Sequence, residues 1–188
     1  MVKIKGYKFF LPIKHITMNS VNSRVQQMKI VHLQADIREH CDKTNNLTNS
    51  IEQIYILFKQ IKQELKIERN EVSFNYRDDV AIKDVFLTIH YITGKIICEK
   101  KQITRDKLKK DALDLFARKN ADYGDAFAEF GPVGVIVRIG DKIFRLKTLN
   151  KRKENKQMVT DESILDTYED LYNYTAMVVM LINEGIPE

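Results

Sequence analysis

The fold class depends on residues 131–150, GPVGVIVRIGDKIFRLKTLN, which can be read as two strands or as one helix. As a hairpin, the strands would flank a turn at Gly140 and Asp141. As a helix, with Pro132 in its first turn, the polar side chains gather on one stripe about 100° wide, at about 100° per residue. That stripe consists of Arg138, Asp141, Lys142 and Arg145.

The apolar side chains of the same stretch gather on the other side of the helix. They are Ile136, Ile139, Ile143 and Leu146. A hairpin would instead place Arg138 and Lys142 on the same face as part of this apolar set. Because the helix separates polar from apolar side chains better, the sequence predicts a helix here despite its β-branched residues.

The last predicted helix follows a charged loop at 151–160. It begins after a cap at Thr160 or Asp161 and reaches about Asn183. Its polar stripe consists of Glu162, Asp166, Glu169, Asp170 and Asn173. The other side is apolar and includes the longest uninterrupted apolar run, residues 176–182. This run is far shorter than the ~20 residues that span a bilayer, so no membrane association is expected.

Three carboxylates of this stripe stand four residues apart, at Glu162, Asp166 and Asp170. Like charges at this spacing repel each other and destabilise a helix. A divalent cation would remove the repulsion, and hard oxygen ligands suit Mg²⁺ or Mn²⁺. The alternative is a solvated acidic face with no ligand.

A second concentration of polar residues lies at 119–131, KNADYGDAFAEFG. Here Tyr123 could stack on a base, and Lys119 could meet a phosphate. Asp122 and Asp125 stand on either side of Tyr123 and Gly124. The alternative is a helix-to-helix corner with a half-buried tyrosine.

The segment upstream, residues 79–103, is ambiguous. Its β-branched and aromatic residues favour a short hairpin near 85–98, whereas Asp78 or Asp79 could cap a helix. The helix is the preferred reading. Thr104 is then the cap of a further helix that runs to about 120.

Two amphipathic patterns, one from Ser20 and one at 51–70, predict a helical hairpin near the N-terminus. Residues 1–104 carry 17 basic and 11 acidic side chains, and residues 105–188 carry 14 and 15. We therefore expect a basic N-terminal helical extension (1–104) and a helical domain (105–188). The basic half favours a phosphate-rich partner such as nucleic acid, with a lysine-rich solvated surface as the alternative.

Composition is that of a soluble globular protein, with 188 residues, 44% hydrophobic and 30% charged side chains and a net charge of +5. Two cysteines, Cys41 and Cys98, form neither a disulfide framework nor a zinc motif. Lys8, Pro12 and Lys14 interrupt any secretion signal at the N-terminus. A cytoplasmic location is expected.

Three segments carry a resemblance to a known family: KNADYGDAF (119–127), GVIVRIGDKIFRL (134–146) and VTDESILDTYEDLYNY (159–174). Together they resemble the nucleotide modification associated domain family, whose members occur in phages and other mobile elements. The pattern is distantly similar to the all-α MazG-like nucleoside triphosphate pyrophosphatases and dimeric dUTPases. The resemblance implies a helical bundle, a nucleotide substrate, a homodimer and, for a viral protein, the host cytoplasm.

The resemblance also implies roles for individual residues. Glu162, Asp166 and Asp170, with Asp141, would hold Mg²⁺ or Mn²⁺, and Asp166 and Asp170 would be catalytic. The nucleotide would contact Lys119, Asp122, Tyr123, Asp125, Arg138, Lys142, Arg145 and Asn173. Where the pyrophosphatases carry Glu-x-x-Glu, this chain has Arg138-x-x-Asp141-Lys142, with fewer carboxylates and added positive charge.

Two functions follow as expectations. The first is a Mg²⁺-dependent nucleotide-processing protein of the nucleoside triphosphate pyrophosphohydrolase type, in which the metal activates a water for attack on the α–β phosphate linkage. The second is a non-catalytic module that binds a nucleotide or nucleic acid.

Overall fold

Six helices make up most of what the structure, a computed structural model, describes: residues 21–41, 50–64, 79–151 and 163–184. They are α1 (Val21–Cys41), α2 (Ser50–Glu64), α3 (Asp79–Lys101), α4 (Arg105–Tyr123), α5 (Gly131–Lys151) and α6 (Ile164–Glu184). These residues contain no strand, so the predicted mainly α helical bundle is confirmed.

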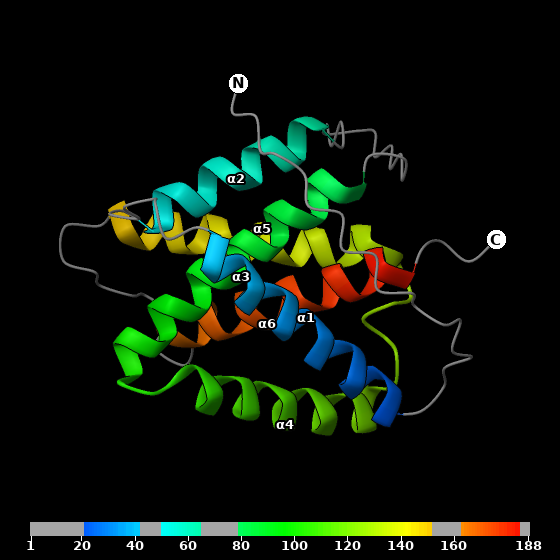
Figure 1. Cartoon of the computed structure of the whole chain (residues 1–188). Coiled ribbons are helices and arrows are strands. Elements are labelled where there is room, and N and C mark those ends of the chain that lie inside the picture. Colours follow the sequence, from blue (N-terminus) through cyan, green and yellow to red (C-terminus); the bar gives the residue numbers. More distant parts are fainter. Residues whose placement is uncertain (1–20, 42–49, 65–78, 152–162, 185–188) are drawn as a thin grey trace.

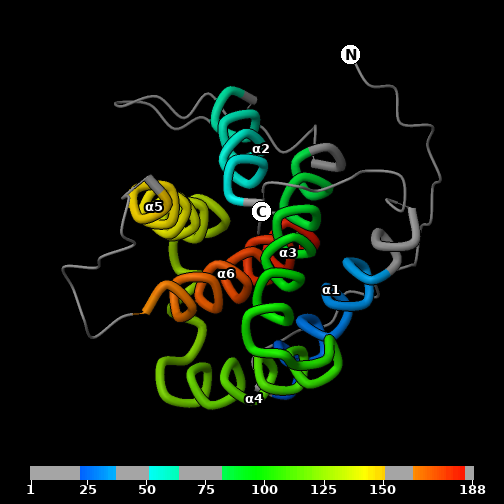
Figure 2. The backbone as a smooth tube through the Cα atoms, turned by 90° about the vertical axis from the view of Figure 1, so that its left-hand side faces the viewer, coloured from blue at the N-terminus to red at the C-terminus, as the bar shows by residue number. Residues whose placement is uncertain are grey.

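Helix α6 lies at the centre of the bundle, with α1, α3, α4 and α5 packed around it (Figures 1 and 2). Every residue from 175 to 182 is buried. A helix that is apolar on all sides must be covered on all sides, and the four surrounding helices provide that cover. Helix α2 packs outside this layer, on α3 and α5.

Helix α5 confirms the predicted separation of side chains, since Ile136, Ile139, Ile143 and Leu146 are all buried. The prediction of a helix over 79–101 is also confirmed, and the alternative hairpin near 85–98 is wrong. Helix α3 packs on α1, α2, α4 and α6, so its β-branched residues are buried on several sides. Tertiary packing on this scale overrides strand propensity.

Two glycines inside helices allow close helix packing rather than turns. A Cβ on Gly94 of α3 would lie 2.9 Å from Cε2 of Tyr172 on α6. A Cβ on Gly140 of α5 would lie 3.0 Å from Cζ of Phe58 on α2. Gly140, which suggests a turn in the sequence, is therefore a helical position where the Phe58 ring leaves little room for a side chain.

The predicted hairpin of the first two helices is not formed: within the described ranges, α1 and α2 do not contact each other. Each lies separately against α3, because α3 offers apolar side chains on opposite sides. The predicted boundary at residue 104 falls between α3 and α4, and one hydrophobic core includes residues from both sides of it. The division into 1–104 and 105–188 stays a prediction.

Helix ends follow local chemistry. The Thr104 hydroxyl accepts a hydrogen bond from the backbone N–H of Lys107 at 3.2 Å, as the predicted cap requires. Helix α6 begins at Ile164, with Ser163 as its cap, so the predicted cap at Thr160 or Asp161 is wrong. Of the helices described, none has the length and apolar character needed to cross a bilayer.

A polar cluster lies inside the core where α1, α3 and α6 meet. Nδ1 of His32 lies 3.1 Å from Nε2 of His90, and Nδ1 of His90 lies 3.0 Å from the carbonyl oxygen of Tyr172. The imidazole of His90 stacks on the Tyr172 ring with 3.8 Å between centroids. Because a carbonyl only accepts, Nδ1 of His90 donates, which leaves its Nε2 to accept from Nδ1–H of His32.

Burial keeps both imidazoles neutral. It lowers the pKa of His32 to about 4, with a further lowering from Lys109 that Asp36 opposes. Burial also lowers the pKa of His90 well below its ordinary value, and the neighbouring His32 adds to this. The bond to the Tyr172 carbonyl acts in the opposite direction. Protonation of either histidine would therefore destabilise the folded bundle.

Gly94→Ala should destabilise the protein, although alanine favours a helix more than glycine does. The new methyl group would collide with Tyr172, and overpacking of a core costs about 1–3 kcal/mol. Urea denaturation of the variant measures the free energy of unfolding. The matched control is Lys95→Ala, at an exposed neighbouring position of α3. Equal stability of the two variants would contradict the close packing of α3 on α6.

The free energy of unfolding should rise with pH between about 4 and 6.5 and then stay level. In this window the unfolded chain binds protons that the buried histidines do not. The pKa shift of His32 from 6.5 to about 4 corresponds to about 3 kcal/mol. Urea denaturation at a series of pH values measures the slope. His32→Gln should reduce the slope, because only His90 then contributes, and an unchanged slope in that variant would rule out this origin.

Candidate functional site

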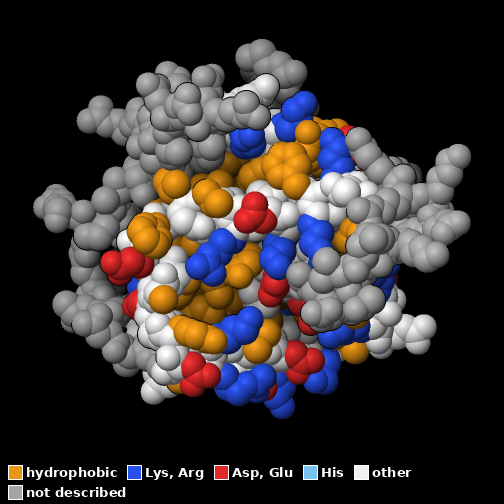
Figure 3. Space-filling view, turned by 180° about the vertical axis from the view of Figure 1, so that it is seen from behind, with side chains coloured by type: hydrophobic (Ala, Val, Ile, Leu, Met, Phe, Trp, Pro, Cys, Tyr) orange, Lys and Arg blue, Asp and Glu red, His pale blue; other side chains and the backbone are white. Residues whose placement is uncertain are grey.

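A cavity of about 370 Å³ opens between α4, α6 and the first half of α5. Figure 3 shows this side of the molecule, with Lys and Arg side chains beside a hollow among hydrophobic side chains. The lining residues are Leu115, Phe116, Lys119, Asn120, Tyr123, Gly124, Ala126, Phe127, Arg138, Asp170, Asn173, Tyr174 and Met177. The three segments that carry the family motifs thus converge on one cavity.

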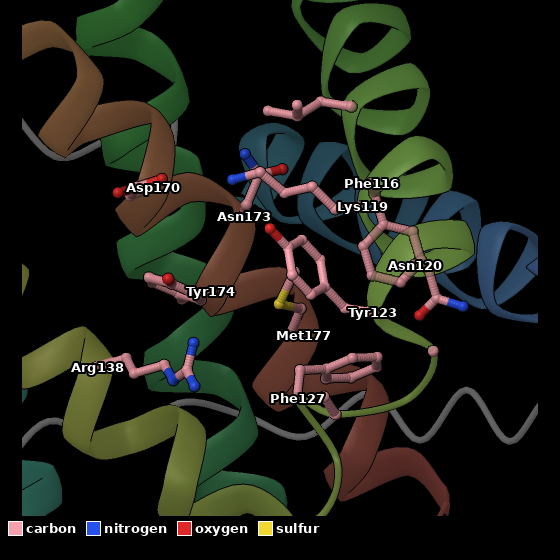
Figure 4. Close-up of a pocket in the computed structure, with 13 residues that line it drawn as sticks. Phe116, Lys119, Asn120, Tyr123, Phe127, Arg138, Asp170, Asn173, Tyr174 and Met177 are labelled. Carbon is pink, nitrogen blue, oxygen red and sulfur yellow. The ribbon is translucent and has the colours of Figure 1, made fainter.

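The wall on the α4 side holds Lys119 and Tyr123, one turn apart near the end of the helix. Figure 4 shows both side chains reaching towards Asn173 on α6. Gly124 ends the helix in the left-handed region (φ +60°), which a side chain rarely allows. The ring of Tyr123 is therefore held at the mouth of the cavity, 73% exposed.

The floor of the cavity is aromatic and apolar. The rings of Phe116 and Phe127 meet edge to face, with 5.7 Å between centroids. Tyr174 and Met177 contribute from α6. Flat apolar surfaces of this kind suit a planar ligand.

A ladder of contacts joins α5 to α6 beside the cavity. Nζ of Lys142 lies 2.8 Å from a carboxylate oxygen of Asp170. One turn further along α5, the guanidinium of Arg145 donates to the hydroxyl of Thr167. Lys142 and Arg145 thus hold the two helices together, and neither lines the cavity.

Two cations line the cavity without a carboxylate partner. The guanidinium carbon of Arg138 lies 5.9 Å from the centroid of the Tyr174 ring, a cation–π contact. In residues 21–41, 50–64, 79–151 and 163–184, neither Arg138 nor Lys119 makes a hydrogen bond or an ion pair. Among the described residues, the side chains of Lys119 from α4 and Arg138 from α5 therefore have no anionic partner.

One polar group of the cavity wall has an unsatisfied acceptor. The amide nitrogen of Asn173 donates to the carbonyl oxygen of Glu169 at 2.9 Å. Its Oδ1 is buried and has no hydrogen-bond partner in the described part of the chain. A buried acceptor of this kind is costly unless a ligand or a water supplies a donor.

The carboxylates predicted to hold a metal are only partly brought together. Asp170 lines the cavity, paired with Lys142. Asp166 accepts a hydrogen bond from the backbone N–H of Ser163 at 2.8 Å, and its own N–H donates to the Ser163 hydroxyl at 3.0 Å. This reciprocal capping box lowers the pKa of Asp166, chiefly through the Ser163 N–H. Asp141 lies exposed on α5.

Glu162, the remaining predicted ligand, lies outside the described residues. Among those that are described, no group of three His, Cys, Asp or Glu side chains is placed to hold a metal ion. The predicted ligand set as a whole stays a prediction.

Five of the predicted nucleotide-contacting residues and catalytic carboxylates line the cavity: Lys119, Tyr123, Arg138, Asp170 and Asn173. Asp122 is exposed on α4 and lies outside the lining. Asp125 points away from the cavity, into an ion pair with Arg24 of α1, with 3.0 Å between Oδ2 and Nη2.

Sequence reasoning missed the aromatic floor and the residue behind it. Phe127 stands inside the quoted 119–127 motif, and Phe116 lies on the apolar stripe of α4, so their spacing could have indicated a shared wall. Arg24 gave a weaker signal, a lone cation beside the apolar positions of α1.

The comparisons with known proteins bear on the segment that builds this cavity. No curated protein and no solved structure matches the chain. Residues 119–182 match the model of one family, described as nucleotide modification associated domain 1. The resemblance of the three motifs to the nucleotide modification associated domain family is thereby confirmed over residues 119–182.

Proposed function

We propose that the cavity between α4, α5 and α6 binds a nucleotide. The base would lie against the aromatic side chains, where stacking contributes about 1–3 kcal/mol per base. Its phosphate would meet Lys119 and Arg138, since charge-assisted hydrogen bonds to phosphate are among the strongest in proteins. The unsatisfied Oδ1 of Asn173 would accept a hydrogen bond from an N–H of the base.

The observation that carries this proposal is the pair of free cations at the edge of an aromatic cavity. Lys142 and Arg145 each have a partner on α6, whereas Lys119 and Arg138 have neither a hydrogen bond nor an ion pair with any described residue. A dianionic phosphate would supply one partner to both. The family description, which names nucleotide modification, is consistent with such a ligand.

Lys119→Met and Arg138→Met should each weaken nucleotide binding about tenfold, and the double variant more. A lost charge-assisted hydrogen bond costs about 1.5–3 kcal/mol. Isothermal titration with canonical and modified deoxynucleoside mono- and triphosphates, with and without Mg²⁺, measures the affinities.

The matched control is Lys110→Met, an exposed position on α4 outside the cavity. Nucleosides without phosphate should bind the wild type and the two cavity variants equally. Undiminished nucleotide affinity in the double variant would refute the phosphate site.

Metal-dependent hydrolysis is the second candidate, favoured by the carboxylate of Asp170 in the cavity wall. Asp166 stands one turn before it on α6, whereas Glu162, four residues before Asp166 in the sequence, lies outside the described residues. A bound Mg²⁺ would supply Lewis-acid activation of a water. The proposed reaction is pyrophosphate release from a nucleoside triphosphate. Binding of nucleic acid through the basic N-terminal half, and homodimer formation, remain predictions.

Asp170→Asn and Asp166→Asn should both abolish Mg²⁺-dependent pyrophosphate release, if these carboxylates hold the metal. Because Asp166 also caps α6, Ser163→Ala is the control, since it loosens the same cap and keeps both carboxylates. Retained turnover in Ser163→Ala with loss in Asp166→Asn assigns a chemical role to Asp166. Full turnover in both Asn variants would exclude it.

A further inference from the structure

Arg24, near the start of α1, is a buried cation far from the matched segment in sequence. Its side chain is only 10% exposed. Nε and Nη2 lie 3.1 Å and 3.0 Å from the same carboxylate oxygen of Asp125. Nη1 contacts Oε1 of Gln27 at 3.1 Å and also donates to the carboxylate of Glu184. One guanidinium thus joins α1, the turn after α4 and the end of α6.

This arrangement leaves little freedom to the groups involved. A buried guanidinium that loses its partner carries a desolvation cost of several kcal/mol. Two carboxylates from different parts of the chain, Asp125 and Glu184, surround it. Movement of the turn that carries Asp125 would remove one of the two charges that compensate Arg24.

The turn in question, residues 124–130, forms one wall of the cavity. Glycines in the left-handed region stand at both ends, Gly124 (φ +60°) and Gly131 (φ +59°). Inside it, the N–H of Ala128 donates to the carbonyl of Asp125 at 2.8 Å. The turn is therefore a compact unit between two conformationally permissive residues.

Arg24 also contacts the cavity wall from behind. Its guanidinium carbon lies 5.4 Å from the centroid of the Phe127 ring. The Phe127 ring also meets the ring of Phe116, and both rings line the cavity. Arg24 thus contacts the aromatic floor in two ways, directly through the Phe127 ring and indirectly through its ion pair with Asp125.

We propose that Arg24 is a positioning residue for the ligand cavity, which holds the 124–130 turn and Phe127 in the geometry that binds. Helix α1, outside the family-matched residues 119–182, then completes the site. The affinity measurement for this inference rests on the proposed nucleotide binding. Amide hydrogen exchange of residues 124–130 tests the positioning role without a ligand.

The test compares Arg24→Met, Arg24→Lys, Asp125→Asn and the Arg24→Met/Asp125→Asn double variant. Affinity for the four deoxynucleoside 5′-monophosphates is measured by titration, well below each melting temperature. Amide hydrogen exchange of 124–130 is measured on the full chain without ligand. The matched control is Lys29→Met, an exposed position of α1.

Arg24→Met should weaken binding about tenfold, equivalent to about 1.4 kcal/mol, and accelerate exchange in 124–130. Asp125→Asn should change both readouts in the same direction, and the double variant should be no worse than Arg24→Met, because both changes break the same Arg24–Asp125 ion pair. Arg24→Lys keeps the charge with fewer contacts and should lie between. The control should match the wild type.

The outcomes separate the two proposals. If the wild type binds no nucleotide, the proposed function fails. If Arg24→Met leaves exchange of 124–130 unchanged, or lowers the melting temperature without changing the affinity of a wild type that binds, the positioning role is overturned.

Discussion

The burial of α6 on all sides is the constraint from which the rest of the bundle follows. A helix that is buried at every position from 175 to 182 cannot lie on a surface, so four other helices must surround it. Apolar area removed from water contributes roughly 25 cal/mol per Å², and α6 has an unbroken run of eight buried residues. The same packing determines where the cavity lies, because the partly buried residues of α6 at 170, 173 and 174 face the space between α4 and α5.

Two polar groups at the helix contacts of this core are held by directional bonds from several elements. His32 and His90 form a chain of hydrogen bonds that ends on a backbone carbonyl of α6. Arg24 is compensated by two carboxylates. Such groups contribute less to net stability than apolar packing does, yet their directional bonds restrict how helices slide or rotate. In this bundle Arg24 near the start of α1 and His32 in its middle fix the position of that helix against α3, the 124–130 turn and α6.

The sequence predicted the elements whose polar and apolar residues separate cleanly. In α5 and α6 a single period of 3.6 residues sorts the side chains, and both helices were predicted. The segment of α3 is apolar on several sides, so periodicity alone could not distinguish helix from hairpin. Its glycine, Gly94, resembles a turn signal in sequence, and only the neighbouring Tyr172 ring explains it.

For the site, the motifs predicted Lys119, Tyr123, Arg138, Asp170 and Asn173, which all line one cavity. Local spacing could not indicate which charges neutralise each other. Arg24 and Asp125 are 101 residues apart in sequence, and Asp170 is compensated by a lysine on another helix. Long-range ion pairs of this kind depend on the packing of whole helices, which no short motif contains.

Adjacent residues of α6 serve the core and the cavity in turn. Tyr172 stacks on His90 inside the bundle, while its neighbour Asn173 lies in the cavity wall. A substitution that shifted this helix to suit a new ligand would disturb the stacked histidine at the same time. Relatives that differ in ligand preference are therefore expected to diverge at α4 and at the 124–130 turn, whose outer sides face water, and to keep α6 almost unchanged.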